Sequence, residues 1–198
     1  FGHIATTSFF PAKPLGCYGD GGAIFTNNDD TASLINSLKV HGKGKHKYEN
    51  VKIGMNSRLD TLQAGILMVK LRAFIDYELQ AMEMVHEQYS QALAHFVDVP
   101  FIPHGYSTCN AQYTIKVSNE NERDSLREHL HKKGIPTMVY YPIPMHQQQA
   151  FSEIGLAPVS LEKTAELCRT VLSLPIHPYL MQHEIDLVVS AVEAGIKG

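Results

Sequence analysis

The sequence predicts an α/β protein in two parts. Short apolar runs rich in strand-forming residues alternate with longer segments whose apolar residues recur at helical spacing. A stretch containing two prolines and a glycine, residues 97–110, separates a first region from a second one. We therefore expect one domain over residues 1–97 and a small α/β domain over residues 98–198.

Net charge, hydropathy and cysteine spacing argue against several kinds of partner and site. The net charge of −3 gives no basic excess, so we expect neither nucleic acid nor a membrane as partner. Apolar runs are too short for a spanning helix. Cys17, Cys109 and Cys168 are widely spaced without a CxxC pair, which argues against disulfides or structural zinc and favours the cytoplasm. The chain begins at Phe1 on strand-like sequence and reads as the continuation of a longer protein.

The first region begins with two expected strands around a glycine-rich segment. Residues 4–10 indicate a buried strand and residues 23–26 a second one. The glycines of residues 16–22 fit neither a Rossmann fingerprint, which needs a helix next, nor a Walker A loop, which needs Gly-Lys-Ser/Thr. They predict a tight strand–loop–strand connection. A helix should begin near Asn28 and end before His41.

A basic loop follows that helix. Residues 43–48 are lysine, histidine, glycine and tyrosine, a composition typical of a mobile solvated loop that could close over an anion. His41 and His46 have no carboxylate or cysteine partner at ligand spacing, so we predict no metal site.

The longest helical pattern runs from a cap at Ser57 or Asp60 to Phe96, and its length predicts a bend or break within residues 72–77. In the second region we expect strands over residues 111–117 and 137–141, and helices over 122–133, 160–171 and 183–196. Ser160 should cap the second of these helices, and Gly134 should end the first.

Lys13 is the first candidate for chemistry. It lies between Pro11 and Pro14, which predicts a short, stiff, extended loop behind a strand. A lysine that forms a Schiff base needs such bracing, because its nitrogen must meet one carbon reproducibly. A solvated loop lysine remains the alternative from this stretch alone. Ser8 offers a hydroxyl nearby, and Asn56 and Arg58 precede a helix start, where anions bind.

The sequence lacks the Gly-x-Ser-x-Gly motif of serine hydrolases, the His-Glu-x-x-His motif of zinc proteases and the glycine-rich loop of protein kinases. Instead, six segments in order resemble the DegT family of sugar aminotransferases, and the resemblance covers the whole chain. The segments are residues 8–13, 19–27, 41–42, 56–64, 140–146 and 173–178.

The resemblance implies part of a fold-type I enzyme that uses pyridoxal 5'-phosphate. This chain would hold the remainder of the large cofactor domain and the small carboxy-terminal domain. Lys13 would form the Schiff base and carry the proton, Ser8 would bind the cofactor phosphate, and Asn56 would reach it from the partner subunit of a homodimer. Tyr141, His146 and the basic loop around His46 would lie near the nucleotide sugar. Glutamate would supply the amino group.

Residues 8–26 most resemble aminotransferases that act on UDP-linked 3-keto hexuronic acids for surface polysaccharide. Arg58 is the candidate for the substrate carboxylate, with a subunit-interface ion pair as an equal alternative. A 4-keto-sugar enzyme and a non-catalytic, regulatory fragment stay open, whereas Lys13 argues against dehydratases of the same fold, which carry histidine there. Family members are roughly twice as long, and the missing half would carry the acid that meets the pyridine nitrogen. Pro14 replaces an asparagine common in the family.

Overall fold

The computed structural model describes residues 2–153 and 159–198. The chain divides into two compact units, Phe1–Tyr77 and Glu78–Gly198. The division precedes the second long helix, because that helix packs into the core of the second unit. The domain boundary expected after residue 97 stays a prediction for the whole protein.

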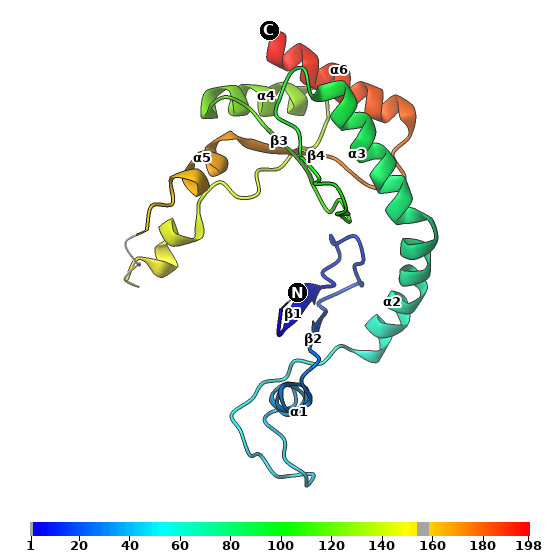
Figure 1. Cartoon of the computed structure of the whole chain (residues 1–198), viewed down its shortest axis with the longest axis vertical. Helices are drawn as coiled ribbons and strands as arrows, with labels where there is room; N and C mark the ends of the chain where they lie inside the picture. The colour runs from blue at the N-terminus through cyan, green and yellow to red at the C-terminus, as the bar shows by residue number, and fades with distance from the viewer. Residues whose placement is uncertain (1, 154–158) are drawn as a thin grey trace. The chain divides into compact units, whose positions relative to one another are not determined.

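In the residues that the structure describes, the first unit contains two strands and two α-helices (Figure 1). β1 (Ala5–Ser8) pairs with β2 (Gly22–Phe25) in antiparallel register. Helix α1 (Asp29–Leu38) begins as predicted, because the Asn28 side chain accepts the Thr31 N–H at 2.7 Å and so satisfies one free helix donor. Helix α2 (Thr61–Ala73) follows a long connection.

The prediction of a buried strand over residues 4–10 is wrong. β1 is shorter, and all four of its residues are exposed. A strand is buried only when other elements cover both of its faces, and the described part of this unit supplies none for β1. Its neighbour β2 likewise leaves Ile24 and Phe25 half exposed, at 50% and 57%.

The predicted break in the long helix is confirmed. α2 passes into a single π-helical segment (Phe74–Glu78) and then into α3 (Leu79–Leu93). A π-helical turn inserts an extra residue in the helical ladder and bends the helix there. Asp60 occupies the N-cap position of α2, although its side chain makes no capping hydrogen bond.

The second unit surrounds an antiparallel pair of strands, β3 (Tyr113–Lys116) and β4 (Val171–Leu174). Helices α4 (Glu120–Lys132) and α6 (Gln182–Lys197) lie side by side, α3 packs on α6, and α5 (Glu162–Thr170) packs on α4 (Figure 1). Two 3₁₀ turns, Met145–Gln147 and Gln149–Phe151, lie between α4 and α5 in the sequence. One continuous core joins these elements through Val85, Tyr89, Leu93, Val97, Tyr113, Ile115, Val117, Leu126, Leu130, Ile135, Val139, Val171, Leu172, Leu174, Ile185, Val188, Ala191 and Val192.

Three local predictions in this unit are wrong. Residues 137–141 form no strand but a single bridge between Met138 and Ser173, because prolines at both ends of the segment cannot donate to a longer ladder. The helix expected to run to residue 171 ends at Thr170, and residues 171–174 form the fully buried strand β4. Ser160 does not cap α5, whose N-cap is Leu161.

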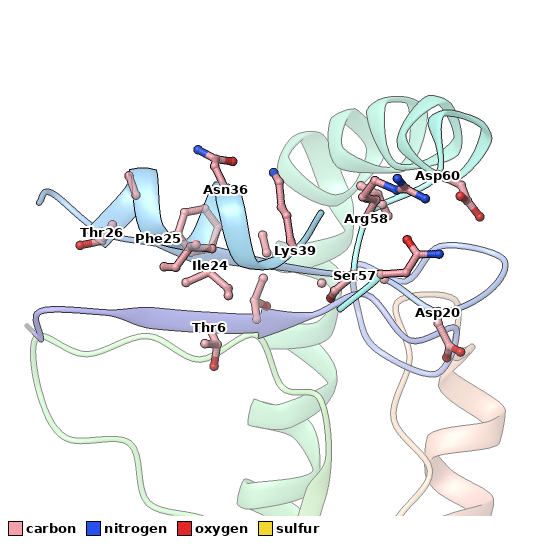
Figure 2. Close-up of a pocket in the computed structure, with 18 of the residues that line it drawn as sticks. Thr6, Asp20, Ile24, Phe25, Thr26, Asn36, Lys39, Ser57, Arg58 and Asp60 are labelled. Atoms are coloured by element: carbon pink, nitrogen blue, oxygen red, sulfur yellow. The ribbon is translucent and has the colours of Figure 1, made fainter. Parts of the chain in front are cut away.

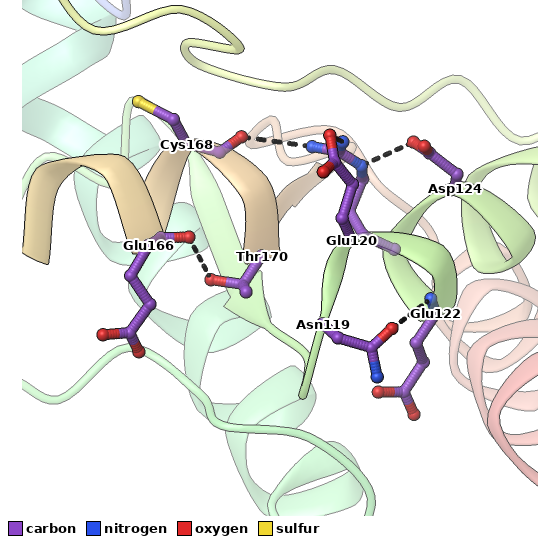
Figure 3. A network of polar contacts seen from close by, with 8 residues as sticks. Asn119, Glu120, Glu122, Asp124, Glu166, Cys168 and Thr170 are labelled. Atoms are coloured by element: carbon purple, nitrogen blue, oxygen red, sulfur yellow. Dashed lines mark hydrogen bonds and ion pairs between the residues drawn. The ribbon is translucent and has the colours of Figure 1, made fainter. Parts of the chain in front are cut away.

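A buried arginine links α4 to the end of α5. Arg123 is only 5% exposed. Its guanidinium donates to the carboxylates of Asp124, at 2.6 Å, and Glu120, at 3.3 Å, and to the Cys168 carbonyl, at 3.2 Å (Figure 3). Asn119 caps the same helix by accepting the Glu122 N–H. The charge is therefore fully paired inside this unit, which suits a structural role.

Candidate functional site

Lys13 lies on a turn rather than on the extended loop that the flanking prolines predict. Its backbone N–H donates to the Phe10 carbonyl at 2.8 Å, and the chain reverses direction through residues 11–15. Proline fixes its own φ at a value that such turns require, so Pro11 and Pro14 stabilise the reversal instead of an extended path. The Lys13 side chain is exposed and makes no ion pair or hydrogen bond with the described residues.

Ser8 ends β1, directly before this turn. Its hydroxyl accepts the Phe10 N–H at 3.2 Å, a local bond that fixes the hydroxyl beside the backbone of the turn. Ser8 is exposed, so a ligand can still reach the hydroxyl, whose own proton remains available for donation. Sequence position and structure thus agree in placing Ser8 and Lys13 on one strand–turn unit.

Asn56 and Arg58 lie on the wall of a cavity of about 1060 Å³ in the first unit. Its other walls come from β1, β2 and α1, and Lys39 and Asp20 add charged groups. Figure 2 shows Lys39, at the C-terminal end of α1, and Arg58, before α2, extending to the same side of β1. Neither Lys13 nor Ser8 lines this cavity. The structure therefore places Asn56 and Arg58 at one cavity and Lys13 outside it.

The backbone around Asn56 is tightly held. Asn56 forms a bridge with Val40, and the Ser57 N–H donates to the Lys39 carbonyl at 2.9 Å. A Cβ on Gly54 would lie 2.2 Å from the Gly42 nitrogen, so only glycine fits this close approach. The Asn56 and Arg58 side chains nonetheless remain exposed, and Arg58 forms no ion pair with any residue that the structure describes.

The basic loop is exposed as predicted, but its backbone is organised. The Glu49 carboxylate accepts the N–H groups of Lys45, at 2.9 Å, and His46, at 3.3 Å. The Ser37 hydroxyl donates to the Lys43 carbonyl at 2.8 Å and ties the loop to α1. A smaller cavity of about 450 Å³ lies between this loop and α1. Lysines therefore project from a shaped turn rather than from an open segment.

Tyr141 and His146 belong to the second unit. Tyr141 is 67% exposed, and its ring meets the edge of the Tyr140 ring at 5.5 Å between centroids. His146 is half-buried in the first 3₁₀ turn. Both side chains are free to contact a ligand, and their roles stay predictions.

Within residues 2–153 and 159–198, no three histidine, cysteine or acidic side chains gather closely enough to hold a metal ion. No helix in that same part of the chain is long and apolar enough to cross a membrane. The three cysteines are free thiols.

Sequence reasoning assigned no role to Lys39, Asp20 or Gln63, which the structure places at the cavity or against the lysine turn. Asp20 and Gln63 lie within segments that resemble the family, and this was the only available signal. Lys39 carried none, because a lysine at the end of a surface helix is common.

The sequence and the fold match a known family. The sequence profile of the DegT/DnrJ/EryC1/StrS aminotransferase family matches residues 1–193. The chain therefore belongs to that family, and the predicted fold class, part of a fold-type I aminotransferase, is confirmed.

Individual relatives agree with this assignment. The chain is 42% identical over 191 residues to a UDP-2-acetamido-2-deoxy-3-oxo-D-glucuronate aminotransferase of Pseudomonas aeruginosa, covering 96% of this chain and 51% of the relative. A solved DegT DnrJ EryC1 StrS aminotransferase from Brucella abortus is 43% identical with a TM-score of 0.93, covering 100% of this chain and 52% of that one. NtdA from Bacillus subtilis, solved with bound cofactor PMP, is 28% identical with a TM-score of 0.89, covering 100% and 47%. The chain thus spans about half the length of the relatives it matches.

Proposed function

We propose that the whole protein transfers an amino group from glutamate to a nucleotide-linked keto sugar with pyridoxal 5'-phosphate. One observation carries this proposal. Lys13, in a chain of an aminotransferase family, stands exposed and unpaired among the described residues on a turn held by its own backbone hydrogen bonds. An amine that is neither buried nor engaged by a carboxylate is available to an aldehyde.

The residues present fit the cofactor. Lys13 supplies the primary amine for the aldehyde, and the Ser8 hydroxyl, at the strand end before the turn, offers a hydrogen bond to the phosphate. When bound, the cofactor supplies an electron sink that makes the substrate's carbon–hydrogen bond acidic. The Lys13 amine would be the group that carries the proton between two carbon positions.

Asn56 belongs to a second part of the site. We propose that the protein is a homodimer and that Asn56 of one subunit binds the cofactor phosphate held by the other. The rigid backbone at Asn56 and its exposed side chain support this role, because a group that reaches across an interface needs a fixed base.

The sugar is a UDP-2-acetamido-3-keto-hexuronic acid, and the reaction serves surface polysaccharide biosynthesis such as that of lipopolysaccharide O-antigen. Similarity to the Pseudomonas aeruginosa relative supports this substrate over a 4-keto sugar. Arg58 is free to pair two-pronged with the hexuronate carboxylate. Tyr141, His146 and the loop around His46 contact the nucleotide sugar. The free thiols fit work in the reducing cytoplasm.

The test uses the full-length protein. It should show a visible absorption band with pyridoxal phosphate that borohydride abolishes, and it should aminate the UDP-linked 3-keto uronic acid with glutamate, as followed by mass spectrometry. Lys13→Ala should remove the band and lower turnover by at least about a hundredfold, the usual range for a proton carrier.

Lys132→Ala is the matched control, because this exposed α4 lysine pairs only with Glu128 among the described residues. It should leave band and turnover unchanged. Absence of the band from the full-length protein would refute the proposal that it is an aminotransferase and support the regulatory alternative. Equal turnover of a 4-keto sugar would refute the substrate assignment alone.

A further inference from the structure

The loop that carries Lys13 is closed at its base. The Phe9 N–H donates to the Gly21 carbonyl at 2.8 Å, and the Cys17 N–H donates to the Phe9 carbonyl at 2.8 Å. Residues 9–21 therefore form a closed loop, which we call the lysine loop. Because the two ends of the loop are hydrogen-bonded to each other, the loop can shift as one body. Its contacts with the rest of the unit then set the position of Lys13.

The interior of the lysine loop is close-packed. Cys17 is fully buried, and its thiol donates to the carbonyls of Phe9, at 3.0 Å, and Gly19, at 3.1 Å. A Cβ on Gly16 would lie 2.6 Å from the Pro11 carbonyl oxygen. The segment after Lys13 thus returns directly against the segment before it. Movement at one side of the loop must be passed to the other.

Helix α2 holds this loop from outside through Gln63. The Gln63 side-chain carbonyl accepts the Tyr18 N–H at 2.8 Å. A Cβ on Gly19 would lie only 3.0 Å from the Gln63 Nε2, so the amide fits against bare backbone. Lys70 of the same helix lies 5.6 Å from the centre of the Tyr18 ring. Among the described residues, Gln63 makes the only hydrogen bond from α2 to the lysine loop.

We propose that Gln63 is a positioning residue for Lys13. It acts through the chain of contacts from Tyr18 to Cys17 to Phe9, and it does not itself touch the reacting atoms. This inference rests on the proposed function, in which Lys13 is the amine that meets the cofactor. An uncharged amide suits the role, because its carbonyl accepts the Tyr18 N–H at every working pH.

The experiment compares full-length Gln63→Leu and Gln63→Glu with wild type. Leucine removes the acceptor at similar size, whereas glutamate keeps a carboxylate oxygen that can accept the same N–H. Gln91→Leu, at an exposed α3 position, is the control for loss of an amide. Far-UV circular dichroism and size-exclusion chromatography should be the same for all four proteins.

The first readout is amide hydrogen exchange in cofactor-free protein. Loss of one hydrogen bond should speed exchange of residues 9–21 about fivefold in Gln63→Leu. Gln63→Glu and Gln91→Leu should exchange like wild type. The second readout is the rate at which added pyridoxal phosphate forms the borohydride-sensitive band. It should fall about tenfold in Gln63→Leu and recover in Gln63→Glu.

The third readout is kinetic. In Gln63→Leu, kcat should fall about tenfold or more while KM for glutamate stays within about twofold, because misplacement of the amine affects chemistry rather than donor binding.

Two results would overturn the proposal. One is unchanged exchange in Gln63→Leu. The other is faster exchange with a wild-type rate of band formation, which would make Gln63 a structural contact only. Failure of the proposed function looks different, because the full-length protein would then show no band, or Lys13→Ala would keep it, while the exchange data still report whether Gln63 holds the loop.

Discussion

The two units differ in what holds them together. The second unit closes a continuous core in which Tyr89, Leu126 and Leu130 are fully buried. In the first unit, the buried apolar side chains among the described residues are those of Cys17 and Leu67. Its order comes instead from backbone hydrogen bonds, a capped helix and close approaches at glycine. Apolar side chains such as Ile53 and Leu62 are left 99% and 75% exposed.

Charges divide in the same way. All ion pairs between the described residues lie in the second unit, and Arg123, its buried cation, is fully used in structure. In the first unit Lys13 and Arg58 have no ionic partner among those residues. A charge that is already paired contributes little to ligand binding, whereas a free one can bind an anion or react. Buried packing and ion pairs are thus concentrated in the second unit, whereas Lys13 and Arg58, unpaired among the described residues, lie in the first.

The largest expected loss of stability comes from truncating a buried side chain in the core of the second unit. Leu130→Ala should lower the free energy of unfolding by about 3 kcal/mol, since it removes fully buried methyl groups and leaves a cavity. Leu62→Ala, the same change on the exposed helix α2, should cost under about 0.5 kcal/mol. Urea unfolding followed by tyrosine fluorescence measures both. Equal losses would contradict the division between the units.

A smaller loss should follow from removing the buried cation. Arg123→Ala should cost about 2 kcal/mol, because it breaks charge-assisted hydrogen bonds and leaves the Cys168 carbonyl without its guanidinium donor. The carboxylates of Glu120 and Asp124 are half exposed and regain water, which keeps the loss moderate.

Arg123→Met separates packing from hydrogen bonding, because methionine keeps much of the aliphatic stem. It should recover part of the loss in the same urea titration. Complete recovery would show that the hydrogen bonds contribute nothing and that Arg123 acts by packing alone.

Sequence reasoning succeeded where one local rule decided the structure. The Asn28 cap gave the start of α1, and the length of the helical pattern gave the break that the π-helical segment makes. It failed where the outcome depended on tertiary neighbours. Residues 171–174 are a strand because β3 lies beside them, and β1 is exposed because the described residues do not cover it.

The candidate site shows the same limit. Lys13 and Ser8 could be singled out, because the spacing of prolines and the family resemblance both point to them. Gln63 could not, because nothing in a helical sequence indicates that the Tyr18 N–H, far away in the chain, needs an acceptor. Long-range pairing between a side chain and a backbone group leaves no periodic pattern.

The smallest expected effect concerns pH and again involves only the second unit. Hydrogen bonds from Lys163, at 2.7 Å, and Lys116, at 3.2 Å, lower the pKa of Glu166 below its ordinary value of 4.5. A carboxylate with a lowered pKa in the folded state adds stability above its unfolded pKa, and this stability is lost as pH falls through the folded value.

Glu166→Gln should therefore lower the urea midpoint slightly at pH 7 and reduce its fall between about pH 5 and pH 3. Glu87→Gln changes the same charge at an exposed α3 position without an ion pair among the described residues, and it should leave the pH profile unchanged. Identical profiles for Glu166→Gln and wild type would show that solvent screens the pair completely. The exposed ion pairs of Glu166 would then add nothing to the stability of the second unit, and its advantage over the first unit would lie in its apolar core and in the buried Arg123.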